Sequence, residues 1–147
     1  MKMSKAFNFV LALAAAAGRA QADAGGGLVV SALFGTEPPP YVHAAVANVL
    51  GFTLPTTKIV VHLSTASLVK PDSFTDQRIS INPDRQHTSS ATGMVTRQHA
   101  SNVRYANEHL EFDHVVLFAS TCRLLVGGGL LESTIRDFHF SAVMQPP

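Results

Sequence analysis

The sequence predicts an α/β domain in which helices cover a mostly parallel β-sheet in three layers. Three observations predict this fold class. Four short apolar runs have the length of strands that are buried on both faces. Longer segments between these runs carry apolar residues at helical spacing. The elements follow the order β-α-β-β-α-β, and strands that alternate with helices form parallel sheets.

The composition supports one folded domain. The chain has 147 residues, of which 46% are hydrophobic and 14% are charged, so it is too apolar for a disordered protein. The formal net charge is +1, and the lysines and arginines are scattered along the chain. Such a chain has no basic patch for a phosphate backbone, so we expect no nucleic acid partner.

Residues 1–22 are expected to be a signal peptide. Lys2 and Lys5 form a basic start, an apolar stretch follows, and Ala20-Gln21-Ala22 has the small-x-small form of a cleavage site. The apolar stretch is shorter than the roughly 20 residues of a transmembrane helix, so no stable membrane span is expected after cleavage. The predicted location is the secretory pathway, in the Golgi lumen or outside the cell. Because Arg19 interrupts the cleavage region, a cytosolic amphipathic or disordered leader stays an alternative.

The first half of the domain follows a glycine-rich linker, residues 23–27. Apolar, β-branched runs predict strands at 28–35, 57–64 and 78–82. Helical spacing predicts a helix over 42–52, with Gly51 able to close it. Prolines 38–40 are expected to lie in a loop, because proline has no N–H donor and a fixed φ.

The second half begins with a polar loop over residues 83–93, where Ser90 or Thr92 could cap the next helix. That helix is predicted over 94–110. Its inner side is expected to carry Val95, His99, Val103, Ala106 and Leu110, and its outer side Arg97, Ser101, Arg104 and Glu108. A strand over 115–118, a glycine loop at 127–129, a helix over 130–137 and a last strand-like piece ending at Val143 complete the order.

Several residues invite a chemical interpretation, each with a plainer alternative. The segment 109–114 has metal-ligating residue types, but it spans a helix end and a strand start, so a solvated turn is preferred and no metal is expected. Cys122 is either a nucleophile or a small buried residue. Glycines 127–129 fit a phosphate loop or any tight loop. Glu132 and Asp137 are expected on a solvated helix face.

The end of the last predicted strand attracts the most interest. There the apolar run gives way to Ala119-Ser120-Thr121-Cys122 and then Arg123. Ligands of open α/β sheets bind at the carboxyl ends of strands, and an arginine placed there can pair with a phosphate through two hydrogen bonds. The alternative for Arg123 is a surface salt bridge with Glu108, Glu111 or Asp113.

Four short patterns together resemble a known family. They are a strand ending in His62-Leu63-Ser64, the Asn82-Pro83-x-Arg85 sequence, the His99-x-x-Asn102-x-x-Tyr105 helix, and the Phe112-Asp113-x-Val115-Val116-Leu117 strand before small polar residues. Residues 58–145 resemble the nucleotide-sugar half of glycosyltransferases of the core-2/I-branching type.

That resemblance implies a Rossmann-like GT-A domain that binds a UDP-sugar. In the family the sugar, N-acetylglucosamine or a related one, passes to a glycan hydroxyl with inversion, and no metal or other cofactor is required. The implied nucleotide-sugar-binding residues are His99, Asn102, Ser120, Thr121 and Arg123. The implied partners are the nucleotide-sugar and a glycan acceptor.

The sequence also departs from that family. Relatives usually have Asn or Asp at the strand tip where Thr121 and Cys122 stand, and the catalytic carboxylate would lie beyond residue 147. We therefore expect residues 28–147 to form a partial glycosyltransferase-like domain, with no catalytic residue assigned and enzymatic activity left open. The alternative function is a non-catalytic secreted α/β interaction module, or a degenerate fragment, with an open sheet edge.

Overall fold

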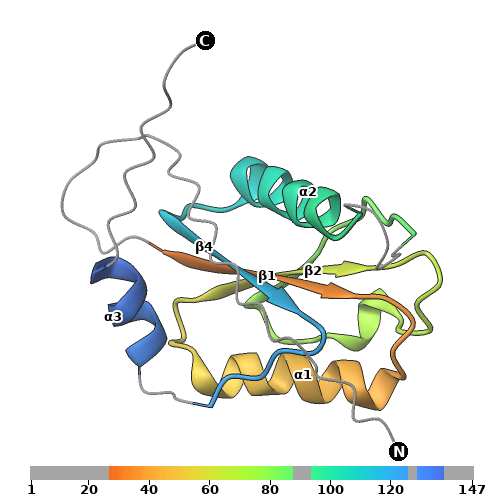
Figure 1. Ribbon diagram of the computed structural model, residues 1–147, viewed down its shortest axis with the longest axis horizontal. Coiled ribbons are helices and arrows are strands. Elements are labelled where there is room, and N and C mark those ends of the chain that lie inside the picture. Colours follow the sequence, from red (N-terminus) through yellow and green to blue (C-terminus); the bar gives the residue numbers. More distant parts are fainter. Residues whose placement is uncertain (1–26, 88–93, 126–128, 138–147) are drawn as a thin grey trace, which may run out of the picture.

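The computed structural model describes residues 27–87, 94–125 and 129–137, and these residues form a sheet covered by helices (Figure 1). The sheet has four parallel strands in the order β3-β2-β1-β4. The strands are β1 (Leu28–Phe34), β2 (Lys58–Leu63), β3 (Ile79–Ile81) and β4 (His114–Ala119). The helices are α1 (Pro39–Phe52), α2 (Met94–His109), α3 (Leu130–Asp137) and the 3-10 turn Pro71–Ser73. The predicted α/β, Rossmann-like fold is confirmed.

The central strand β1 determines where the chain changes direction. It pairs in parallel with β2 on one side and with β4 on the other. Helix α1 connects β1 to β2 and covers one face, whereas α2 precedes β4 and covers the other (Figure 1). In sheets of this kind the strand order reverses between β1 and β4, and ligands bind outside the carboxyl ends of the strands at that point.

The face covered by α1 is apolar. Alternate residues of the strands point toward it, and they pack against the buried side of the helix. The cluster comprises Val30, Ala32, Phe34, Ile59, Val61, Leu63, Val69 and Phe118 with Val42, Ala45, Val46 and Val49 of α1. Burying each large apolar side chain contributes roughly 1.5 to 3 kcal/mol, so this layer supplies much of the stability of the domain.

The face covered by α2 is divided. Near the amino ends of the strands it is apolar, with Val29, Val60, Ala106 and Val115 packed together. Farther along, the buried residues of α2 are Gln98, His99, Ser101 and Asn102. The expected inner side of this helix was therefore partly wrong: Ser101 is buried and Val95 is 38% exposed. Hydrogen bonds to polar groups of the sheet and of the loop after β3, described below, hold this turn of the helix against the sheet.

Helix α1 begins inside the proline run, which corrects the expectation of a loop through residues 38–40. Pro39 and Pro40 occupy its first turn, where the backbone N–H groups have no helical partner, so proline costs no hydrogen bond there. The other end differs as well. Gly51 lies within α1, and the helix ends where the Thr53 hydroxyl donates to the Val49 carbonyl at 2.7 Å.

Glu132 is buried, not solvated as its position on a short amphipathic helix suggested. Its side chain is 4% exposed, and Oε1 accepts hydrogen bonds from Leu54 N and from the Thr57 hydroxyl, both at 2.7 Å. The carboxylate thus ties α3 to the turn between α1 and β2. This bond joins residues more than 70 positions apart, which a local sequence pattern does not reveal.

Some expectations fall on residues that the structure does not describe. These are the signal peptide over 1–22, most of the linker over 23–27, the helix caps Ser90 and Thr92, glycines 127 and 128, and the strand-like piece ending at Val143. The Asp137 side chain also lies outside the description. Within the described residues no helix is long and apolar enough to cross a membrane.

Candidate functional site

The carboxyl edge of the sheet is the candidate site. Each strand there gives way to a small or polar residue: Gly35, Ser64, Asn82 and Ser120. The switch point lies between the ends of β1 and β4, and their register brings Leu33 opposite Ala119. The segments that follow these two strands therefore emerge side by side, and their side chains decide what this edge can bind.

Arg123 is held on the β4 side of this edge. Its guanidinium carbon lies 4.6 Å from the centroid of the Tyr41 ring. Its Nη1 donates to the carbonyls of Ser120, at 3.0 Å, and of Cys122. The Tyr41 hydroxyl donates to the same Ser120 carbonyl at 2.9 Å. Because the side chain stays exposed, it offers a positive charge to a ligand at the tip of β4.

The salt-bridge alternative for Arg123 does not occur. Within the described residues the ion pair is between Arg78 and Asp76, at 3.3 Å, at the other end of the sheet. The cation at the β4 tip is thus supported by an aromatic ring and by carbonyl oxygens. Neither of these neutralises its charge, so attraction for an anion is retained.

The β1 side of the edge has the opposite character. Prolines 38–40 carry no N–H, and the first amides of α1, those of Tyr41 and Val42, both donate to the Pro38 carbonyl at 2.9 and 3.2 Å. The Gly35 amide donates to the Glu37 carboxylate. Dinucleotide-binding sheets place a phosphate on free amides at this position. Here those donors are missing or engaged, and a negative charge stands beside them.

His99 and Asn102, two of the implied binding residues, lie inside the protein and not at this edge. His99 Nδ1 is 2.8 Å from the Ser31 hydroxyl of β1. Asn102 Nδ2 lies 3.0 Å from the same hydroxyl and donates to the carbonyls of Ala32 and Val60 at 3.3 and 3.1 Å. The structure groups these residues with the sheet beneath α2, whereas Arg123 contacts α1 on the other face.

The network continues to the loop after β3. Asn82 Nδ2 donates to Asn102 Oδ1 and to the Ser101 hydroxyl, each at 3.0 Å. Ser101 in turn donates to Asp84 Oδ2 at 2.7 Å. The backbone N–H of Gln86 donates to His62 Nε2 at 3.1 Å. No binding role was predicted for Ser31, or for His62, which entered only as part of the pattern at the end of its strand. The local signal for both residues is a polar side chain within an apolar strand.

The electrostatics of the network follow from burial. Burial and, to a lesser extent, the nearby His62 lower the pKa of His99 to about 4. Burial also lowers the pKa of His62, against the opposing charge of Asp84. A hydrogen bond from Ser101 and, to a smaller extent, one from Gln86 lower the pKa of Asp84. Both imidazoles are therefore neutral at pH 7, so neither serves as a cation for a diphosphate.

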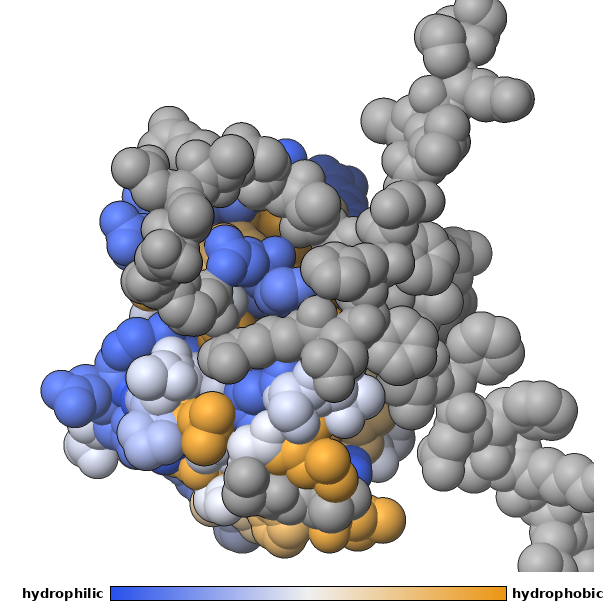
Figure 2. All heavy atoms as spheres, turned by 90° about the vertical axis from the view of Figure 1, so that its left-hand side faces the viewer, coloured by the Kyte–Doolittle hydropathy of each residue, from blue (hydrophilic) through white to orange (hydrophobic). Residues whose placement is uncertain are grey.

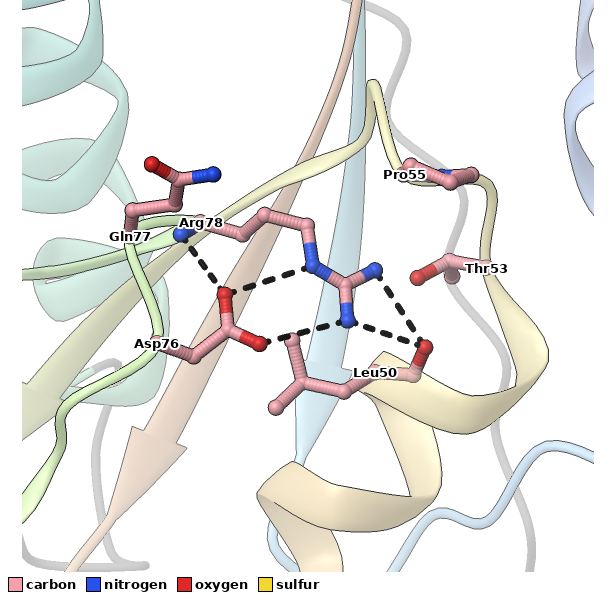
Figure 3. A pocket seen from close by; sticks show the side chains of 6 residues that line it. All are labelled: Leu50, Thr53, Pro55, Asp76, Gln77 and Arg78. Atoms are coloured by element: carbon pink, nitrogen blue, oxygen red, sulfur yellow. Dashed lines mark hydrogen bonds and ion pairs between the residues drawn. The ribbon is translucent and has the colours of Figure 1, made fainter.

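A hollow of about 490 Å³ lies at the opposite, amino end of the sheet (Figure 3). Its lining residues are Leu50, Thr53, Pro55, Asp76, Gln77 and Arg78. The Arg78 guanidinium donates to the Leu50 carbonyl at 3.3 Å and pairs with Asp76. A cation at the last carbonyls of α1 complements the helix dipole, so these groups have a structural role. Figure 2 faces this end and shows apolar side chains in small groups among polar ones.

Two of the remaining chemical candidates, the metal-ligating residue types and Cys122, can be followed in the described residues. In the part of the chain that the structure describes, no three His, Cys, Asp or Glu side chains gather so that they could hold a metal ion. Cys122 is half-buried and packs against the apolar cluster on the α1 side, together with Leu124. Its environment is that of a core residue.

Comparisons with known proteins leave the family open. No family model matches the chain, and no curated protein and no solved structure matches it either. The fold and the geometry of its carboxyl edge are therefore the basis for a functional assignment.

Proposed function

We propose that this chain is a glycosyltransferase-like domain that binds a UDP-sugar, with the diphosphate at the tip of β4. One observation carries the proposal: Arg123 stands exposed at the carboxyl end of β4, beside the switch point of a parallel Rossmann-like sheet. This is the position where open α/β sheets bind their ligands. The short sequence patterns shared with branching glycosyltransferases support the same reading.

The chemistry of the tip suits a diphosphate. Within the described residues, the Arg123 guanidinium donates its hydrogen bonds through Nη1. Its Nε and Nη2 groups can therefore face a ligand. These two groups form the fork that pairs with phosphate oxygens. The hydroxyls of Ser120 and Thr121 stand on the same tip and add donors. A cation there would offset the charge that develops on the leaving diphosphate without a metal.

Sugar transfer also requires a base for the acceptor hydroxyl. No described residue is assigned that task, so the proposal for this chain is donor binding, with N-acetylglucosamine or a related sugar as the donated group. A glycan acceptor and a place in the secretory pathway belong to the same proposal.

Isothermal titration with UDP and UDP-N-acetylglucosamine tests the proposal. We expect binding with a dissociation constant below about 1 mM, and a loss of about tenfold in Arg123→Ala, since charge-assisted hydrogen bonds are strong. Arg97→Ala is the matched control, because Arg97 is an exposed arginine on α2, across the sheet. Absence of binding to either nucleotide, or equal binding by Arg123→Ala, would contradict the proposal.

A non-catalytic interaction module is the second candidate, and the sheet edge favours it. Within the described residues β4 pairs on one side only, with β1. Leu125, just beyond the tip, is 85% exposed. Unpaired strand edges accept strands from other chains. Light scattering after size-exclusion chromatography separates the candidates: a monomer that binds UDP supports the first, and an obligate oligomer without nucleotide affinity supports the second.

A further inference from the structure

Tyr41 connects two parts of the candidate site. It lies in the first turn of α1, yet its hydroxyl donates to the Ser120 carbonyl, 79 positions away at the β4 tip. Its ring also lies beneath the Arg123 guanidinium. Tyr41 and Arg123 therefore share one acceptor, Ser120 O, and contact each other directly.

This arrangement restricts the motion of Arg123. A free arginine side chain samples many rotamers, and a ligand must overcome that loss of entropy when it binds. Stacking on an aromatic ring holds the guanidinium plane by a cation–π interaction and leaves its edge accessible. The edge is where the N–H donors point, so a stacked arginine is oriented in advance for phosphate oxygens.

The proline run makes Tyr41 a rigid support. Pro39 and Pro40 fix φ at two consecutive positions, and the Tyr41 amide is bonded to the Pro38 carbonyl at 2.9 Å. The Tyr41 backbone is therefore held in the first turn of α1, and α1 itself packs on the apolar core. The same prolines that remove the amide donors on the β1 side thus stiffen the support of the cation on the β4 side.

We propose that Tyr41 is a positioning residue for nucleoside diphosphate binding: it orients Arg123 and the β4 tip toward the phosphates. This inference rests on the proposed function and adds to it a residue of α1 that no sequence pattern indicated. Tyr41 acts through Arg123, so its contribution depends on the presence of that side chain.

A double-mutant cycle with UDP as the probe tests this dependence. We expect Tyr41→Leu to weaken UDP binding about fivefold and Tyr41→Phe, which keeps the ring, about twofold. In an Arg123→Ala background, Tyr41→Leu should have no further effect, because coupled residues are not additive. The salt dependence of binding should fall in Tyr41→Leu, as is also expected for Arg123→Ala.

Tyr105→Leu is the matched control. Tyr105 is the other tyrosine of the chain, and it lies in α2, where its ring stacks with that of His109. This substitution should leave UDP binding unchanged, and thermal unfolding of each variant shows that it is folded. Equal UDP affinity of wild type and Tyr41→Leu overturns this inference but leaves the proposed function standing. An equal loss with and without Arg123 also overturns it, since Tyr41 would then act independently. If wild type does not bind UDP, both fall together.

Discussion

The two faces of the sheet are both buried, but different forces hold them. Beneath α1 the contacts are between aliphatic and aromatic side chains, which can be exchanged for others of similar volume at modest cost. Beneath the first half of α2 the contacts are hydrogen bonds among Ser31, His99, Asn102 and Asn82. Such a network requires each partner, since a buried polar group left alone is costly.

This difference teaches where the domain is tolerant and where it is specific. The apolar layer supplies stability without fixing one exact arrangement. The polar layer fixes the position of α2 along the strands, because Asn102 reaches carbonyls of two neighbouring strands, Ala32 of β1 and Val60 of β2. A shift of α2 by one residue would break these bonds.

Asn102→Ala should produce the largest effect. Asn102 is fully buried, and its amide donates to Ser31, Ala32 and Val60 while its oxygen accepts from Asn82. Loss of all these bonds should lower the free energy of unfolding by about 4 kcal/mol, measured by urea denaturation. Asn107→Ala, at an exposed position of the same helix, should change it by less than about 0.5 kcal/mol. A small effect at Asn102 would mean that the polar layer is not needed.

Acidification should have the next largest effect and act mainly through the polar layer. Since burial depresses the pKa of His99 from 6.5 to about 4, the unfolded chain takes up a proton at higher pH than the folded one. The free energy of unfolding should therefore be unaffected by His99 above pH 6.5 and fall as the pH decreases toward 4, by about 3 kcal/mol in total. His62, whose pKa is also lowered, contributes in the same direction.

Urea denaturation at several values between pH 7 and pH 5 measures this slope, in a range above the ordinary titration of the carboxyl groups. His99→Gln should make the slope shallower, because the glutamine amide has no charge to acquire. His109→Gln, at an exposed histidine of the same helix, should leave it unchanged. A wild-type stability that does not vary over this range would show that the imidazoles are not buried in solution.

Val49→Ala tests whether the apolar layer contributes to stability independently of the polar layer. Val49 is 1% exposed beneath α1, and removal of two methyl groups should lower the free energy of unfolding by about 2 kcal/mol. The pH slope should match that of wild type, because the buried residues of this cluster are all aliphatic or phenylalanine side chains. A steeper slope in Val49→Ala would indicate that the two faces do not act independently.

Local patterns in the sequence predicted most of the described elements. The strands predicted at 28–35, 57–64 and 78–82 correspond to Leu28–Phe34, Lys58–Leu63 and Ile79–Ile81, because apolar and β-branched runs reflect burial directly. The start of α1 among prolines was missed, since proline is tolerated in a first helical turn but not beyond it.

The polar contacts were harder to predict, because they join distant positions. His99 and Ser31 are separated by 68 residues, and Glu132 and Leu54 by 78. A histidine or glutamate in a helix has the same local pattern whether it meets solvent or a buried partner. Of the implied binding residues, Ser120, Thr121 and Arg123 lie at the carboxyl edge as the strand end indicated, whereas His99 and Asn102 do not.

The three prolines before Tyr41 have one further consequence. A cradle of main-chain amides persists through almost any substitution, because all residues except proline carry the same N–H group. Where prolines occupy this position, as at 38–40, the proposed binding of an anion at this end of the domain depends on individual side chains. Under that proposal, replacement of Arg123 alone should be sufficient to remove it.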